Sequence, residues 1–87
     1  MDKIIKLNKL IKIAERWRKV NKEYEAGVVL IWGSKAYGWK DQLRDPHQER
    51  PGAIAVDAAG QVFEAQGGDD YNGAKCWIRM KDSGVVN

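Results

Sequence analysis

YEAGVVLIW, residues 24–32, contains the point at which the chain changes from one hydrophobic period to another. Before Gly27, apolar residues recur at three- and four-residue spacing, which is typical of an amphipathic helix. After Gly27 they come in short runs separated by glycine-containing turns, which is typical of strands. We therefore expect an α+β fold, in which one N-terminal amphipathic helix packs on a four- or five-stranded antiparallel β-sheet.

The composition is that of an ordinary globular chain, with 87 residues, 44% hydrophobic and 31% charged. This length predicts one domain, divided into a helix over 1–27, a sheet over 28–81 and a tail over 82–87. A single cysteine, Cys76, excludes an internal disulfide and fits a reducing compartment. No secretory signal and no transmembrane run is apparent, so we expect a cytoplasmic protein with no membrane partner.

The sheet region divides into strands and loops. Val28–Trp32 is almost wholly apolar and is expected to be a central strand covered on both faces. In the second strand, alternation places Tyr37 and Trp39 on the same side. Residues 41–52 contain both prolines and are expected to form an exposed loop with a short helical turn over 41–44. The remaining expected strands are 36–40, a hairpin of 53–57 and 61–66, and 74–80.

The apolar arc of the predicted helix is about 200° wide and extends from Val20 to Ile4. A small sheet usually covers a narrower stripe. Part of the arc, namely Ile4, Ile5 and Ile11, is therefore predicted to contact a second copy in a homodimer. The alternative is that the sheet curls around the helix.

Positive charge is concentrated in the helix. Residues 1–27 hold eight Lys or Arg against four acids, a balance of +4, whereas residues 28–87 hold seven against eight. At about 100° per residue, Lys9, Lys12, Arg16 and Lys19 fall on one stripe opposite the apolar face. The stripe fits either a face that contacts nucleic-acid phosphates or a face that is simply solvated.

Trp77 is the aromatic candidate for the same nucleic-acid interface. Alternation in the last strand places it between Lys75 and Arg79, opposite Cys76, Ile78 and Met80. A tryptophan between cations can stack on a base, or it can cover the sheet beneath lysine stems.

Two polar loops form the other candidate surface, because loops on a rigid sheet commonly carry function. We predict that they bind a protein partner. The residues assigned to this surface are Arg44, Asp45, His47, Arg50, Asp69 and Asp70.

No catalytic, cofactor or metal motif of any strength is present, so we expect a protein that is not an enzyme. Cys76 is predicted to be a buried structural thiol, and nothing beyond residue type supports a hydrolase built on Cys76 and His47. The stretch Asp69–Gly73 is similar to part of a calcium loop but lacks the glutamate at the twelfth position.

Two stretches, VVLIWGSKAYGWKDQLRDPHQERPGAIAVD (28–57) and GGDDYNGAKCWI (67–78), carry a resemblance. Through the pieces W-x6-W-x4-R-D and R-P-G-A-x-A-V-D, the chain resembles small accessory proteins of bacterial mobile genetic elements, of the integron-cassette and antirestriction-labelled type. The resemblance implies a bacterial mobile-element setting and a non-enzymatic role. We therefore expect a small binding protein that acts on an unknown host protein, with a nucleic-acid-binding module as the alternative.

Overall fold

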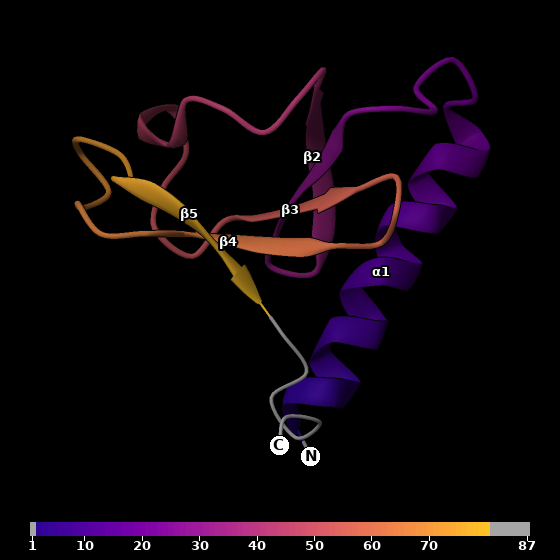
Figure 1. The fold of residues 1–87 in the computed structure, drawn as a ribbon, viewed down its shortest axis with the longest axis horizontal. Coiled ribbons are helices and arrows are strands. Elements are labelled where there is room, and N and C mark those ends of the chain that lie inside the picture. The colour runs from indigo at the N-terminus through magenta and orange to yellow at the C-terminus, as the bar shows by residue number, and fades with distance from the viewer. Residues whose placement is uncertain (1, 81–87) are drawn as a thin grey trace.

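The computed structural model describes residues 2–80, and the side chains of residues 7–80. Helix α1 spans Asp2–Val20 and packs on a sheet of five antiparallel strands in the order β2-β1-β3-β4-β5 (Figure 1). The strands are β1 Val28–Trp32, β2 Lys35–Lys40, β3 Ile54–Asp57, β4 Val62–Gln66 and β5 Cys76–Met80. The expected α+β fold is confirmed. The expected tail over 82–87 lies outside the described residues.

One face of the sheet packs against α1. Leu7, Leu10 and Ala14 are buried, and their spacing places them on one side of the helix. They contact a sheet face built around Val29 and Ile31, which are almost completely buried. β1 lies between β2 and β3 and its first four residues are buried, so the expectation of a central, doubly covered strand is confirmed.

The helix ends at Val20, so the prediction of a helix to residue 27 is wrong. Arg18 is the physical reason. Its guanidinium donates hydrogen bonds to the carbonyls of Tyr24 (2.8 Å), Ala26 (3.0 Å) and Gly27 (2.9 Å). Residues 21–27 are thereby held as an irregular segment that returns along the end of the helix to β1.

Because α1 ends at Val20, its apolar face is narrower than the arc expected from the sequence. Val20 is 79% exposed and does not belong to the core, contrary to expectation. Tyr24 packs although it lies outside the helix, because its ring sits 5.5 Å from that of Trp17 and 4.6 Å from that of Trp39. Gly27 adopts a φ of 76°, and a side chain there would collide with Trp39.

A β-bulge in β2 reverses one expectation about the sheet. Leu30 pairs with Gly38 but Ile31 pairs with Ala36, so Tyr37 is an extra residue without an opposite partner. Trp39 packs against the helix-side core, whereas Tyr37 reaches the loop that covers the other face. The prediction that both rings share one side is therefore wrong.

The face opposite α1 is covered by the 41–52 loop. Leu43 of this loop packs on Val28, Leu30 and Ala55. The predicted helical turn over 41–44 is wrong, because residues 41–43 form bends, and the loop instead contains a 3-10 helix, η1, over Pro46–Gln48. Figure 1 shows the segment that carries η1 well separated from α1.

The expected hairpin of β3 and β4 is confirmed. Asp57 begins its turn, and the Asp57 carboxylate accepts hydrogen bonds from the backbone of Ala59 (3.0 Å) and Gln61 (2.7 Å). Gly60 supplies the left-handed residue that such a turn requires.

Candidate binding surface formed by two loops

The 41–52 loop is fixed to β2 by a buried polar cluster. The ammonium of Lys40 lies 3.2 Å from the carboxylate of Glu49, and the two side chains are 10% and 9% exposed. The Tyr37 hydroxyl donates a short hydrogen bond to the other Glu49 oxygen. Lys40 also donates to the carbonyls of Arg44 (3.2 Å) and Asp45 (3.4 Å). Lys40, at the end of β2, thus binds the loop at Arg44, Asp45 and Glu49.

The second loop, residues 67–73, is closed by Asp69. Its carboxylate accepts hydrogen bonds from the backbone N–H groups of Tyr71 (3.0 Å) and Asn72 (2.7 Å), and from the Asn72 amide (3.3 Å). Because these bonds favour the charged form, the pKa of Asp69 lies below its usual range. Asp69 and Gly73 also pair through their backbones. The loop is therefore a defined structure.

The fold brings these two loops against each other, although the sequence separates them. The Ala74 N–H donates to the Glu49 carbonyl at 2.9 Å. The His47 carbonyl lies so close to Gly73 that no side chain fits there, and Gly73 has a φ of 86°. The guanidinium of Arg50 lies 3.6 Å from the Asp70 carboxylate.

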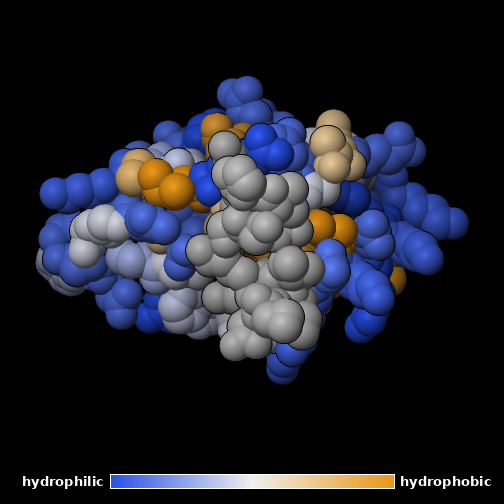
Figure 2. All heavy atoms as spheres, turned by 60° about the horizontal axis from the view of Figure 1, so that its bottom comes forward, coloured by the Kyte–Doolittle hydropathy of each residue, from blue (hydrophilic) through white to orange (hydrophobic). Residues whose placement is uncertain are grey.

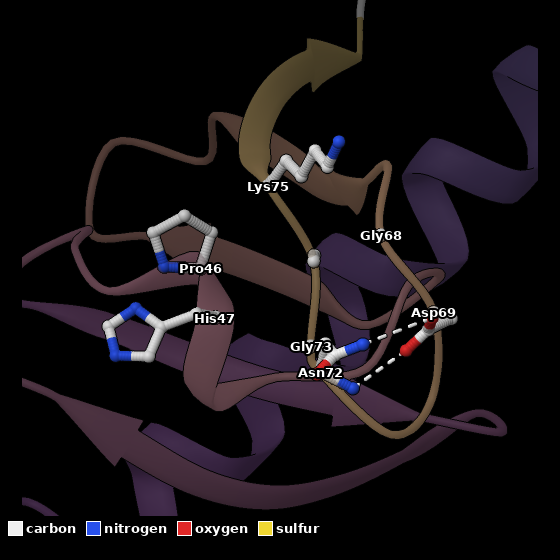
Figure 3. A pocket seen from close by; sticks show the side chains of 8 residues that line it. Pro46, His47, Gly68, Asp69, Asn72, Gly73 and Lys75 are labelled. Atoms are coloured by element: carbon white, nitrogen blue, oxygen red, sulfur yellow. Dashed lines mark hydrogen bonds between the residues drawn. The ribbon is translucent and has the colours of Figure 1, made fainter.

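A shallow depression of about 720 Å³ lies where the two loops meet (Figure 3). Pro46 and His47 of η1 form one wall, and Asp69 and Asn72 form the other. Lys75 lies at the end nearest β5. The depression presents one negative and one positive side chain to a partner, namely Asp69 and Lys75.

Exposed aromatic side chains flank this surface. The Arg50 guanidinium lies 4.4 Å from the centre of the Trp32 ring, a cation–π contact. Trp32 is 42% exposed and Tyr71 is 95% exposed. Contacts therefore run from Trp32 through Arg50 to Asp70, the neighbour of Tyr71. We call Trp32, Arg50, Asp70 and Tyr71 the aromatic patch.

The structure brings together only part of the predicted partner-binding set. His47, Arg50, Asp69 and Asp70 lie where the loops meet. Arg44 lies earlier in the loop, where it contacts Asp41 at 3.0 Å and Asp45 at 2.5 Å. The hydrogen bonds to these two carboxylates raise the pKa of Arg44.

The exposed rings of Trp32 and Tyr71, and the Lys40–Glu49 pair beneath the loop, are absent from the predicted partner-binding set. Both aromatic residues were visible in the sequence at predicted turns, since Trp32 precedes Gly33 and Tyr71 lies in the polar stretch before Gly73. Glu49 belongs to the charge-rich loop that the sequence identifies, but no signal indicated its pairing with Lys40, because the pairing depends on how the loop folds over β2.

The predicted nucleic-acid set is divided between two faces. Lys9, Lys12, Arg16 and Lys19 are all exposed on α1, as a basic stripe requires. Trp77 instead packs beneath the 41–52 loop, against the cluster opposite α1, and its indole N–H donates to the Arg44 carbonyl at 3.3 Å. Trp77 therefore covers the sheet, and it does not share a surface with the stripe.

Cys76 is exposed, so the prediction of a buried thiol is wrong. Alternation in β5 holds, since Met80 packs on the helix-side core. However, Ile78 is 43% exposed, because α1 leaves this end of the face uncovered.

In the predicted dimer set, Ile11 is partly buried against the core. The side chains of Ile4 and Ile5 lie outside the described part of the chain, and the homodimer stays a prediction.

Within residues 2–80, no helix is both long and apolar enough to cross a membrane. Among the described side chains, no three His, Cys, Asp or Glu residues gather as metal ligands would. The fold and surface together define a small α+β protein with a helix on an open antiparallel sheet and an ordered two-loop surface. Comparisons with protein-family models, curated proteins and solved structures find no match.

Proposed function

We propose that this chain is a small non-enzymatic binding protein that contacts a protein partner through its two-loop surface. The observation that carries the proposal is the exposed aromatic patch, in which Trp32 at the end of β1 contacts Arg50 and Tyr71 projects from the hydrogen-bonded 67–73 loop. Trp, Tyr and Arg are the residues that dominate binding energy in protein interfaces. Loops held by internal hydrogen bonds lose little conformational freedom on binding, so more of the contact energy contributes to affinity.

The partner is best sought among bacterial proteins. The resemblance to accessory proteins of mobile genetic elements supports that setting, in which a small product acts on a protein of its host. The depression between the loops presents Asp69 and Lys75, which suits a partner surface of mixed charge better than one of a single sign.

The test compares two exposed side chains on different surfaces. Tyr71→Ser removes the exposed ring of the patch, and Val20→Ser removes an exposed apolar side chain at the end of α1. Wild type and both variants are immobilised and exposed to a nuclease-treated bacterial lysate. Proteins retained by the wild type are identified by mass spectrometry and purified, and their affinity is measured by calorimetry.

We expect one retained protein whose affinity falls about 30-fold with Tyr71→Ser, the scale of a 2 kcal/mol hot spot. Val20→Ser should leave that affinity unchanged. Proteins retained equally by wild type and Tyr71→Ser would show that the two-loop surface is not the binding site.

A further inference from the structure

A second surface of the molecule, on the helix side, is built differently. A groove of about 480 Å³ lies between α1 and the β1–β2 turn. We propose that this groove binds the phosphodiester backbone of a nucleic acid, independently of the two-loop surface. The residues that line it are Asn8, Lys9, Lys12, Ile13, Arg16 and Ser34.

The cations of the groove are not used within the fold. Elsewhere, Lys40, Arg44 and Arg50 form ion pairs with acids, and Arg18 is occupied by backbone carbonyls. Within residues 7–80, Lys9, Lys12 and Arg16 form no ion pair and remain exposed, as do Lys75 and Arg79 outside the groove. Among the described side chains, no acid lines the groove. Its positive charge is therefore available to an anionic ligand.

The spacing of these cations favours an extended ligand over a small anion. Lys9 and Arg16 are seven residues apart, which corresponds to about 10 Å along a helix axis at 1.5 Å per residue. Measured along the axis of a duplex, where each strand carries one charge every 3.4 Å, that length covers about three phosphates. A single phosphate would contact one end of this row and leave the cation at the opposite end unneutralised.

Neutral donors lie on both sides of the row. Asn8 is on α1, and Ser34 lies across the groove in the β1–β2 turn with a left-handed φ of 68°. Amide and hydroxyl groups commonly contact phosphate and sugar oxygens, and such contacts carry no sequence information. Trp77 lies on the other face, so we expect binding without base stacking and without sequence preference.

A membrane surface is the less suitable anionic ligand. A helix that lies in a membrane interface inserts a broad apolar face into the lipid. Over residues 7–20 of α1 that face is occupied, because Leu7, Leu10 and Ala14 are buried against the sheet. Figure 2 shows mostly hydrophilic side chains on the right of the molecule, where α1 lies in Figure 1.

The experiment is a salt titration with a matched pair of variants. Lys12→Gln/Arg16→Gln removes one Lys and one Arg from the groove. Lys75→Gln/Arg79→Gln removes one Lys and one Arg from exposed positions outside it, so the net charge is the same. Binding to a labelled DNA duplex and to labelled oligo-dT is measured by fluorescence anisotropy, and circular dichroism checks the helix.

For three phosphate contacts, the slope of log K against log salt for duplex DNA should be about −2.7, which is about a 40-fold loss between 50 and 200 mM KCl. The groove variant should reduce the slope by about two, because each lost contact removes about one. The control variant should keep the wild-type slope. Tyr71→Ser should also bind DNA normally, which separates this proposal from the loop surface.

Three outcomes would overturn the proposal. The first is no DNA binding by the wild type at 50 mM KCl. The second is an equal loss of slope in both charge variants, which would assign binding to net charge alone. The third is binding to phosphatidylserine-rich vesicles without binding to DNA, which would assign the groove to lipid.

Discussion

Glu49 is the side chain on which the position of the 41–52 loop depends most. Its carboxylate pairs with Lys40 and accepts from Tyr37, and its backbone carbonyl accepts from Ala74 in the other loop. Glu49→Ala removes the carboxylate and leaves a lysine that is 10% exposed without its ionic partner. The backbone bond to Ala74 remains possible only while the loop stays in place.

The expected cost can be derived from these contacts. Removal of one member of a buried ion pair typically costs about 3–5 kcal/mol. Lys40 keeps three oxygen acceptors, from Arg44, Asp45 and Gln48, so we expect the lower limit, about 3 kcal/mol. A chain of 87 residues has a total stability of about 4–13 kcal/mol. The melting temperature should therefore fall by about 12–24 °C.

Urea unfolding followed by tryptophan fluorescence measures this loss. Glu49→Gln serves as the intermediate case, because it keeps an acceptor for Tyr37 but loses the charge; we expect about 1–2 kcal/mol. The double variant Lys40→Met/Glu49→Leu should be less destabilised than the two single changes added together. A loss below about 1 kcal/mol for Glu49→Ala, or full additivity in the double variant, would refute the reasoning.

Two further predictions concern titration and thiol exposure. Burial and the hydrogen bond to Glu49 raise the pKa of Tyr37. The free energy of unfolding should therefore be unaffected by this group below pH 10 and should fall as the pH rises above it, because the unfolded chain loses the proton first. Absorbance titration should show a late tyrosine ionisation that Tyr37→Phe abolishes; its absence in the wild type would contradict the contact between Tyr37 and Glu49. Cys76 is exposed, so it should react with Ellman's reagent in the native protein as fast as in urea. Protection in the native state would contradict this placement.

The main elements of the fold could be predicted because local signals mark them. The change of period at Gly27 located the start of the sheet at Val28, and the Asp57–Gly60 turn located one hairpin. The end of the helix could not be predicted, since it depends on Arg18 reaching carbonyls in a segment that follows it. The orientation of Tyr37 failed for a similar reason, because a bulge has no signature in the alternation of side chains.

The candidate site was less predictable than the fold. Polar composition identified both loops, but nothing local indicates that His47 and Gly73 touch. Cys76 shows the same limitation. Alternation placed it on the correct side of β5, yet burial depends on how far α1 extends across the sheet. Both the contact between the loops and the exposure of Cys76 depend on how segments that are remote in sequence pack together.

The buried Lys40–Glu49 pair suggests why the loop is held by charges at all. A well-packed apolar pair at such a site is often as stable or more so, because the ions lose their hydration on burial. An apolar pair, however, would not bind the carbonyls of Arg44 and Asp45 as the Lys40 ammonium does. The pair therefore fixes the path of the loop more than it adds to stability. If this is correct, Lys40→Met/Glu49→Leu should keep much of the stability but lose the partner that Tyr71→Ser also loses. A double variant that unfolds the whole domain would instead give the pair a general structural role.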